Sequence, residues 1–204
     1  MEPFRTLTSL AAPLDRTNVD TDQIIPKQFL KRIERTGYGE FLFYDWRRTA
    51  TGEEDAVFEL NQPRYKGARI LIAGKNFACG SSREHAAWAL SDFGFRVVIA
   101  PSFADIFFSN AGKNGIVLAR LSEAEVAELL NNAKTIQNYQ LTVSLEEQTV
   151  TDGRGFKASF VVDPFRKFCL TEGLDDIGLT LRHEAALDAF ETKHDEAVWL
   201  KAKS

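Results

Sequence analysis

The chain has 204 residues, of which 44% are hydrophobic and 26% are charged, and its formal net charge is −4. This composition is typical of a folded globular protein and excludes a disordered chain, a collagen-like repeat and a coiled coil. The small negative charge gives no reason to expect a nucleic-acid partner.

The cysteines indicate a reducing compartment, because the only two, Cys79 and Cys169, form neither a CxxC pair nor a dense disulfide spacing. The first residues lack a signal-peptide pattern, and no stretch approaches the ~18 apolar residues of a membrane span. We therefore expect a cytoplasmic protein without a membrane segment. An iron–sulfur cluster takes three or four thiolates, and the histidines lack metal-ligand spacing, so we expect no metal on this chain.

The beginning of the chain is irregular. Residues 7–16 predict a strand, and residues 18–26 predict a polar turn that runs into a helix or bend closed by Pro26. Residues 31–54 mix arginine, glycine and aromatic side chains without a clear period. This pattern indicates a long ordered loop or a pair of short helices. Its aromatic content favours contact with a partner, and hence greater mobility in the free chain.

From residue 68 the pattern becomes regular. Residues 69–73 and 95–100 predict two buried strands, and the helix between them has the apolar spacing of one buried face. A strand–helix–strand unit predicts a parallel pair with a right-handed crossover. The predicted continuation is a helix from Pro101 to near Gly112, a strand at residues 116–118, and a helix over residues 123–133 opened by a Ser122–Glu125 capping box.

The last part of the chain predicts antiparallel strands and a terminal helix. Residues 139–145 and 156–162 alternate apolar and polar side chains, and Asp152-Gly153 supplies the turn between them. Residues 181–200 are charged and helical, and we expect them to pack across the surface. The predicted fold class is α/β with a mixed parallel and antiparallel sheet.

The chemistry is expected at residues 74–85, which join a strand end to a helix start, where open α/β sheets bind ligands. Gly80 permits a tight turn, and Ser81 or Ser82 would cap the helix. The free N–H groups of the first turn and the Arg83 guanidinium favour a carboxylate or phosphate. The simpler alternative is an ordinary serine-capped helix start. The positive end of the helix dipole repels a cation such as Arg83 at this position, unless an anion lies between them.

Sharper catalytic motifs are absent from this segment. Five residues separate Gly74 from Gly80, so the spacing is not that of a P-loop, and the Gly-x-Ser-x-Gly of a nucleophile elbow does not occur. Cys79 is interpreted as a small residue that fills the turn. His85 is interpreted as a helix-surface or capping residue rather than a catalyst. For residues 18–26 taken alone, an Asx-turn is the simplest interpretation.

Two segments together carry a resemblance to a known family. Residues 18–26 read NVDTDQIIP and resemble its Asn-x-Asp-Thr-Asp-x-Ile-Ile-Pro signature. Residues 76–90 read NFACGSSREHAAWAL and resemble its Asn-Phe-Gly-Cys-Gly-Ser-Ser-Arg-Glu-His-Ala-x-Trp-Ala-Leu signature. With further similarity at residues 100–107 and 173–178, the chain resembles the small subunits of 3-isopropylmalate dehydratase. Ala78 departs from the family's glycine, and a methyl group there is strained if the residue is left-handed.

The resemblance implies a fold, a reaction and a partner. The fold is a swivelling β/β/α domain over residues 1–204, like the C-terminal domain of aconitase. The partner is a large subunit that holds a [4Fe–4S] cluster. The reaction interconverts 2-isopropylmalate and 3-isopropylmalate, which are dicarboxylates, by dehydration and rehydration through 2-isopropylmaleate in leucine biosynthesis.

The resemblance also implies roles for individual residues. By similarity to aconitase, Ser81 would be the base, Arg83 would support it and hold a substrate carboxylate, and Asp22 would belong to the polar network at the subunit junction. The expected substrate-binding residues are Thr21, Leu30, Lys31, Arg32, Gly80, Ser82 and Arg83. The segment around Lys31 and Arg32 would contact the distal group of the substrate, and simple exposure to solvent is the equal alternative for these two side chains.

Two other functions stay open. One is the small subunit of another aconitase-like hydro-lyase, such as a homoaconitase or a methylmalate (citraconate) hydratase, because the motifs are shared. The other is a carboxylate-binding or regulatory module without a catalytic role.

Overall fold

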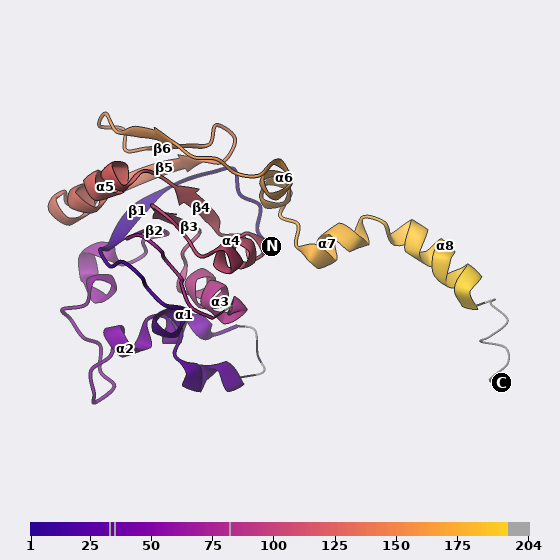
Figure 1. Cartoon of the computed structure of the whole chain (residues 1–204), viewed down its shortest axis with the longest axis horizontal. Helices are drawn as coiled ribbons and strands as arrows, with labels where there is room; N and C mark the ends of the chain where they lie inside the picture. Colours follow the sequence, from indigo (N-terminus) through magenta and orange to yellow (C-terminus); the bar gives the residue numbers. More distant parts are fainter. Residues whose placement is uncertain (33, 35, 82, 196–204) are drawn as a thin grey trace.

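A seven-stranded mixed sheet forms the centre of the molecule, in the order β4-β3-β2-β1-β5-β6-β7 (Figure 1). The computed structural model describes residues 1–32, 34, 36–81 and 83–195. The strands are β1 (Thr6–Leu14), β2 (Ile70–Ala73), β3 (Val97–Ala100), β4 (Val117–Arg120), β5 (Gln140–Ser144), β6 (Thr149–Thr151) and β7 (Lys157–Ser159). The predicted α/β class with a mixed sheet is confirmed.

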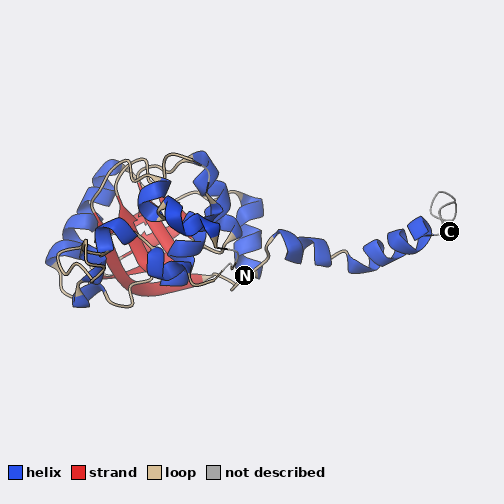
Figure 2. Cartoon of the chain, turned by 90° about the horizontal axis from the view of Figure 1, so that it is seen from below, coloured by secondary structure: helices blue, strands red, loops and turns tan. Residues whose placement is uncertain are grey.

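Helices cover both faces of this sheet (Figure 2). The α-helices are α1 (Thr21–Ile24), α2 (Tyr44–Arg47), α3 (Glu84–Phe93), α4 (Asp105–Lys113), α5 (Glu123–Thr135), α6 (Pro164–Glu172), α7 (Asp176–Leu181) and α8 (Glu184–Asp195). The 3-10 helices are η1 (Lys27–Lys31), η2 (Tyr38–Phe41), η3 (Glu59–Asn61) and η4 (Pro63–Tyr65). Over the described ranges, no helix combines the length and apolar character that crossing a membrane requires.

Strand β1 joins a parallel half of the sheet to an antiparallel half. Its residues 6–10 pair antiparallel with β5, and its residues 11–14 pair parallel with β2. Strands β2, β3 and β4 are parallel and are connected by α3 and α4, which confirms the predicted strand–helix alternation. Strands β5, β6 and β7 are antiparallel.

Two apolar clusters fill the space on either side of the sheet. In β2 the side chains of Leu71 and Ala73 belong to the cluster beneath α3 and α4, whereas Ile70 and Ile72 belong to the cluster beneath α5. All four are fully buried. Such continuous apolar runs are expected for parallel strands with helices on both faces.

The antiparallel half contains one strand that the sequence did not indicate. The predicted turn at Asp152-Gly153 connects β6 to β7, and the Asp152 carboxylate accepts hydrogen bonds from the backbone N–H groups of Arg154 (2.7 Å) and Phe156 (3.0 Å). Strand β6 has three residues. Three residues are too few to show the alternation by which strands are recognised.

The C-terminal helices differ from the prediction in their placement. Helices α7 and α8 extend away from the sheet and its covering helices (Figures 1 and 2), rather than packing across the surface. Their apolar side chains Ile177, Leu181 and Phe190 are exposed. Periodicity shows which side of a helix is apolar, but not which surface that side meets. The predicted helix continued to residue 200, and residues 196–204 lie outside the described part of the chain.

The segment of residues 31–54 contains the short helices η2 and α2, one of the two predicted forms. Tyr38 and Phe43 are fully buried in this chain's own apolar cluster. Gly39 allows η2 to approach α3, because a Cβ atom there would lie 2.6 Å from the backbone nitrogen of Phe93. The dependence of this segment on a partner stays a prediction.

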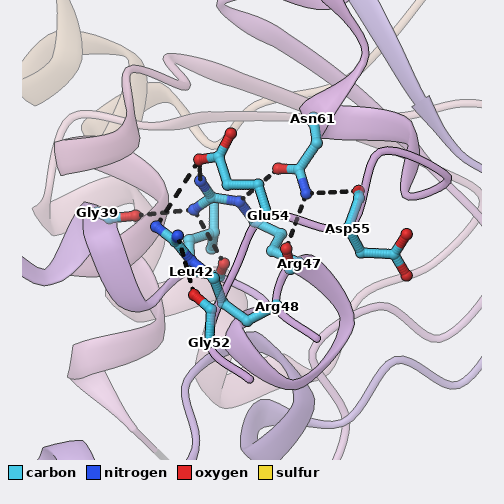
Figure 3. A network of polar contacts seen from close by, with 8 residues as sticks. All are labelled: Gly39, Leu42, Arg47, Arg48, Gly52, Glu54, Asp55 and Asn61. Atoms are coloured by element: carbon cyan, nitrogen blue, oxygen red, sulfur yellow. Dashed lines mark hydrogen bonds and ion pairs between the residues drawn. The ribbon is translucent and has the colours of Figure 1, made fainter. Parts of the chain in front are cut away.

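Arg47 connects the turns of this segment (Figure 3). Its Nη1 donates to the carbonyls of Gly39 and Leu42, both at 3.3 Å, and its Nε donates to Asn61 Oδ1 at 3.1 Å. The Asn61 amide donates in turn to the Arg47 carbonyl at 2.8 Å. Burial lowers the pKa of Arg47, and the neighbouring Arg48 lowers it further. A buried cation with this many acceptors specifies one arrangement of the loop.

We expect Arg47→Met to lower the free energy of unfolding by about 2–4 kcal/mol, because buried acceptors lose their donor. Arg48→Met is the matched control, because both arginines lie 3.7 Å from the Glu54 carboxylate, but the Arg48 side chain is 27% exposed and that of Arg47 only 8%. Its expected loss is below about 1 kcal/mol. Urea denaturation of both variants measures the difference, and equal losses would contradict the role given to Arg47.

Candidate active site

Two loops that follow β1 and β2 run side by side and form the site. The Asn18 N–H donates to the Lys75 carbonyl (2.8 Å), the Cys79 N–H donates to the Val19 carbonyl (3.0 Å), and the Thr21 N–H donates to the Cys79 carbonyl (2.8 Å). Because β1 and β2 are parallel, their carboxyl ends meet at one edge of the sheet. This edge is the ligand-binding position predicted for the fold class.

Gly80 lies where the second loop passes the Asp20 side chain of the first. Its φ is +91°, and a Cβ atom there would lie 2.3 Å from the Asp20 carboxylate. That carboxylate also accepts the Asp22 N–H (2.6 Å), while the Asp20 N–H donates to Gln23 Oε1 (2.8 Å), so a capping box opens α1. The chain bends at Gly80 with a positive φ, which favours glycine, and the close approach of Asp20 is an additional reason for glycine.

Thr21 ties α1 to the backbone of Ser81. The Thr21 side chain is buried, and its Oγ1 donates to the Ser81 carbonyl at 2.9 Å. The Ser81 residue itself is exposed and borders a pocket. Thr21 therefore fixes the main chain that presents the Ser81 hydroxyl.

Ala78 adopts the left-handed conformation, with φ +60°, and is buried. A left-handed alanine is strained by roughly 1–2 kcal/mol relative to glycine. Asn76 is also left-handed (φ 58°), and its Nδ2 donates to Asn18 Oδ1 at 2.9 Å. Unusual backbone conformations thus recur along this loop, as they often do at functional sites.

Helix α3 begins at Glu84, and Arg83 is its N-cap residue, without a capping hydrogen bond from its side chain. The expectation that Ser81 caps the helix is wrong, because Ser81 lies three residues before Glu84. Ser82, the other expected cap and a predicted substrate contact, lies outside the described residues. With φ −138° the Arg83 backbone is extended, and its side chain pairs with α1 instead.

Asp22 is held between two cations. One carboxylate oxygen pairs with Nη1 of Arg83, and the other lies 3.1 Å from Nζ of Lys27. The Arg83 side chain is 11% exposed, whereas that of Lys27 is 73% exposed. The structure thus brings the predicted residues Asp22 and Arg83 into direct contact. It adds Lys27, which the sequence analysis did not select.

One pocket is lined by residues of both loops and of α4. Its volume is about 210 Å³, and its described lining comprises Thr21, Ala78, Gly80, Ser81, Arg83, Ala104, Asp105, Ile106 and Phe107. This volume is smaller than the roughly 300–1,000 Å³ that is typical of sites for drug-sized ligands. No motif in the sequence indicated the wall formed by α4, although α4 follows the next parallel strand, β3, and therefore starts at the same edge of the sheet.

The predicted distal-group residues lie elsewhere. Leu30 is half-buried against the main apolar cluster, and Lys31 is exposed at the end of η1. Arg32 pairs with Glu40 at 3.0 Å and stacks over Phe41, with its Cζ atom 5.1 Å from the ring centre. Leu30, Lys31 and Arg32 are not among the described residues that line the pocket. Their contact with a substrate stays a prediction.

Cys79 and His85 show no sign of activation. Burial raises the pKa of the Cys79 thiol, and Asp20 raises it further. His85 packs against the rings of Tyr38 and Trp88, with ring centres 5.3 Å and 4.7 Å away, and burial lowers its pKa. At neutral pH the thiol is protonated and the imidazole is neutral. In residues 1–32, 34, 36–81 and 83–195, no three His, Cys, Asp or Glu side chains are grouped to hold a metal ion.

Three family models together match most of the chain. The aconitase C-terminal domain matches residues 1–124, a model described as LeuD_N matches residues 127–164, and the C-terminal domain of the 3-isopropylmalate dehydratase small subunit matches residues 176–203. Two relatives bear the name 3-isopropylmalate dehydratase small subunit. That of Acidobacterium capsulatum is 70% identical over 200 residues, which cover 98% of this chain and 94% of the relative. That of Brevibacillus brevis is 58% identical over 193 residues, which cover 95% and 100%.

A solved structure shows the same fold. The crystal structure of 3-isopropylmalate dehydratase (leuD) from Methanocaldococcus jannaschii superposes with a TM-score of 0.65 at 21% identity, over 90% of this chain and 98% of that one. The fold, the paired loops that form the site and the family models all indicate the same family. The chain therefore belongs to the family of 3-isopropylmalate dehydratase small subunits, which carry the aconitase C-terminal domain fold.

Proposed function

We propose that this chain, with a large subunit that bears a [4Fe–4S] cluster, interconverts 2-isopropylmalate and 3-isopropylmalate through 2-isopropylmaleate in the cytoplasm. Membership of the family supports this reaction. The observation that carries the proposal is the pocket that Ser81 and Arg83 line together, because it joins a hydroxyl-bearing and a guanidinium-bearing residue in one site. A dicarboxylate substrate suits such a cation.

Arg83 binds one substrate carboxylate in this proposal. A guanidinium offers two parallel hydrogen bonds that match a carboxylate, and Arg83 is mostly buried, so its side chain is restricted. Asp22 orients the guanidinium from the opposite side through their ion pair. Thr21 and Gly80 hold the adjoining backbone in place.

Ser81 acts as the base. In dehydration its oxygen takes the proton from the carbon next to the one that bears the hydroxyl, and in rehydration it returns a proton to the substrate. Free serine is far too weak an acid to supply an alkoxide, and desolvation raises its pKa further, so nearby positive charge must more than compensate. Arg83 is the positively charged side chain in the described lining of the pocket.

The cluster is assigned to the large subunit because of the donor set of this chain. The two cysteines, a half-buried Cys79 with a raised pKa and a buried Cys169 in α6, do not provide the three or four thiolates that a cluster requires. Such a cluster supplies the Lewis acid that binds the departing hydroxyl. The contributions of this chain are carboxylate binding and proton transfer.

The role of Ser81 is tested with Ser81→Ala in the reconstituted two-subunit enzyme. We expect kcat to fall by about 10³-fold, because the general base is lost. KM and the affinity between the two subunits should change by less than about threefold. Ser109→Ala, at an exposed position of α4, is the matched control and should retain full activity. A kcat within tenfold of the wild-type value would show that Ser81 is not the base.

Arg83→Lys separates charge from geometry. The ammonium keeps the positive charge but cannot make two parallel hydrogen bonds, so we expect KM to rise and kcat to fall by about tenfold each. Arg154→Lys, at an exposed turn, controls for the loss of an arginine. Steady-state kinetics on 2-isopropylmaleate measures both constants, and unchanged values for Arg83→Lys would contradict bidentate binding.

The substrate is tested by comparing 2-isopropylmaleate, citraconate and homoaconitate with the reconstituted pair. We expect the highest kcat/KM for 2-isopropylmaleate. A preference for either of the other two would assign the chain to another aconitase-like hydro-lyase. Binding of dicarboxylates without turnover by any cluster-bearing partner would indicate a regulatory module instead.

A further inference from the structure

We infer that Lys27 is a positioning residue of this site: it balances the charge of Asp22, so that Arg83 remains available to a substrate carboxylate. The inference rests on the proposed function and extends it to a residue outside the motifs. Lys27 does not line the pocket among the described residues, and it acts through Asp22.

The local fold brings Lys27 back to Asp22. Helix α1 ends at Ile24, and the next two residues, Ile25 (φ −141°, ψ 107°) and Pro26 (φ −62°, ψ 146°), are extended. Ile24, Ile25 and Pro26 are buried, so this turn is anchored in the core. The first residue of η1, Lys27, then places its Nζ 3.1 Å from the Asp22 carboxylate.

The charges at the pocket explain why a second cation matters. The Arg83–Asp22 pair is neutral by itself, and two further carboxylates lie nearby: Asp20 against Gly80, and Asp105 in the pocket lining. A dicarboxylate that approaches this arrangement meets a neutral ion pair and two like charges. Lys27 brings the sum of these five charges from −2 to −1, and it does so at Asp22. Because Lys27 balances the Asp22 carboxylate, the Arg83 guanidinium keeps more of its attraction for a substrate carboxylate.

This role differs from that of an ordinary surface ion pair. An exposed lysine paired with an aspartate contributes little to stability, and the Lys27 side chain is 73% exposed. Its partner Asp22, however, shares its other oxygen with the mostly buried Arg83. Loss of Lys27 therefore affects substrate binding through Asp22 and leaves the fold unchanged.

The experiment uses the reconstituted two-subunit enzyme. Lys27→Met should raise KM for 2-isopropylmaleate by about tenfold at low ionic strength, with kcat and Tm nearly unchanged. Lys27→Arg, which retains the charge, should keep KM within about threefold of the wild-type value. Lys134→Met is the matched control, because Lys134 pairs with a single aspartate, Asp15 (2.5 Å), at the end of α5.

Two further measurements test the Lys27 charge: its salt dependence shows that the effect is electrostatic, and its dependence on Asp22 distinguishes action through Asp22 from direct contact with the substrate. The KM difference between the wild type and Lys27→Met should shrink as salt is raised, because the exposed ammonium is screened. The Ki of 2-isopropylsuccinate, which has both carboxylates but no hydroxyl, should be the same in Asp22→Asn and in Asp22→Asn/Lys27→Met. Additive effects of the two substitutions on Ki would overturn the positioning role.

The outcomes separate the inference from the proposed function. An active wild-type enzyme whose KM is unaffected by Lys27→Met refutes the inference alone. A wild-type complex without activity on 2-isopropylmaleate refutes the proposed function, and the inference with it. An equal rise of KM in Lys134→Met would show a general effect of surface charge and would likewise overturn the assignment to Lys27.

Discussion

The candidate site depends on the backbone pairing of residues 18–21 with residues 75–79. Hydrogen bonds between these loops bring α1, which carries Asp22, beside the start of α3, where Arg83 lies. The Asp20 carboxylate takes part twice, because it caps α1 and occupies the space that a side chain at Gly80 would need. Residues that are distant in sequence are thus positioned by main-chain contacts, which hold the loops more rigidly than exposed side-chain pairs would.

The sheet explains why these contacts form at one edge. Strands β1, β2 and β3 are parallel neighbours, so the loops that follow them start from the same side of the sheet. The loop after β1 supplies α1, the loop after β2 supplies Ser81, and the loop after β3 supplies the first turn of α4. The antiparallel half, joined through β1, lies away from this edge and completes the second apolar cluster with α5. The position of the pocket is therefore a consequence of topology.

Sequence signals that lie within a few residues predicted much of this fold. Contacts that depend on how separate elements pack were not predicted. The strands β2 and β3 are apolar runs, and the Ser122–Glu125 capping box forms as expected, because each signal lies within a few residues. The orientation of α8 depends on contacts that periodicity does not describe. Among the site residues, Asp22 and Arg83 were found through motifs. Lys27 was missed because its contact with Asp22 arises from the turn at Pro26, and a spacing of five matches neither helix nor strand.

Ala78 shows how this loop accommodates a side chain at a left-handed position. The left-handed backbone at Asn76, Ala78 and Gly80 is imposed by the pairing of the two loops, so the chain cannot relax it locally. A left-handed alanine costs roughly 1–2 kcal/mol. Burial of its methyl group in the main apolar cluster stabilises the fold by about 0.8 kcal/mol. The reduced conformational freedom of the unfolded chain stabilises it by about 0.4–1 kcal/mol more. These contributions nearly cancel, and the geometry that presents Ser81 is retained at little net cost.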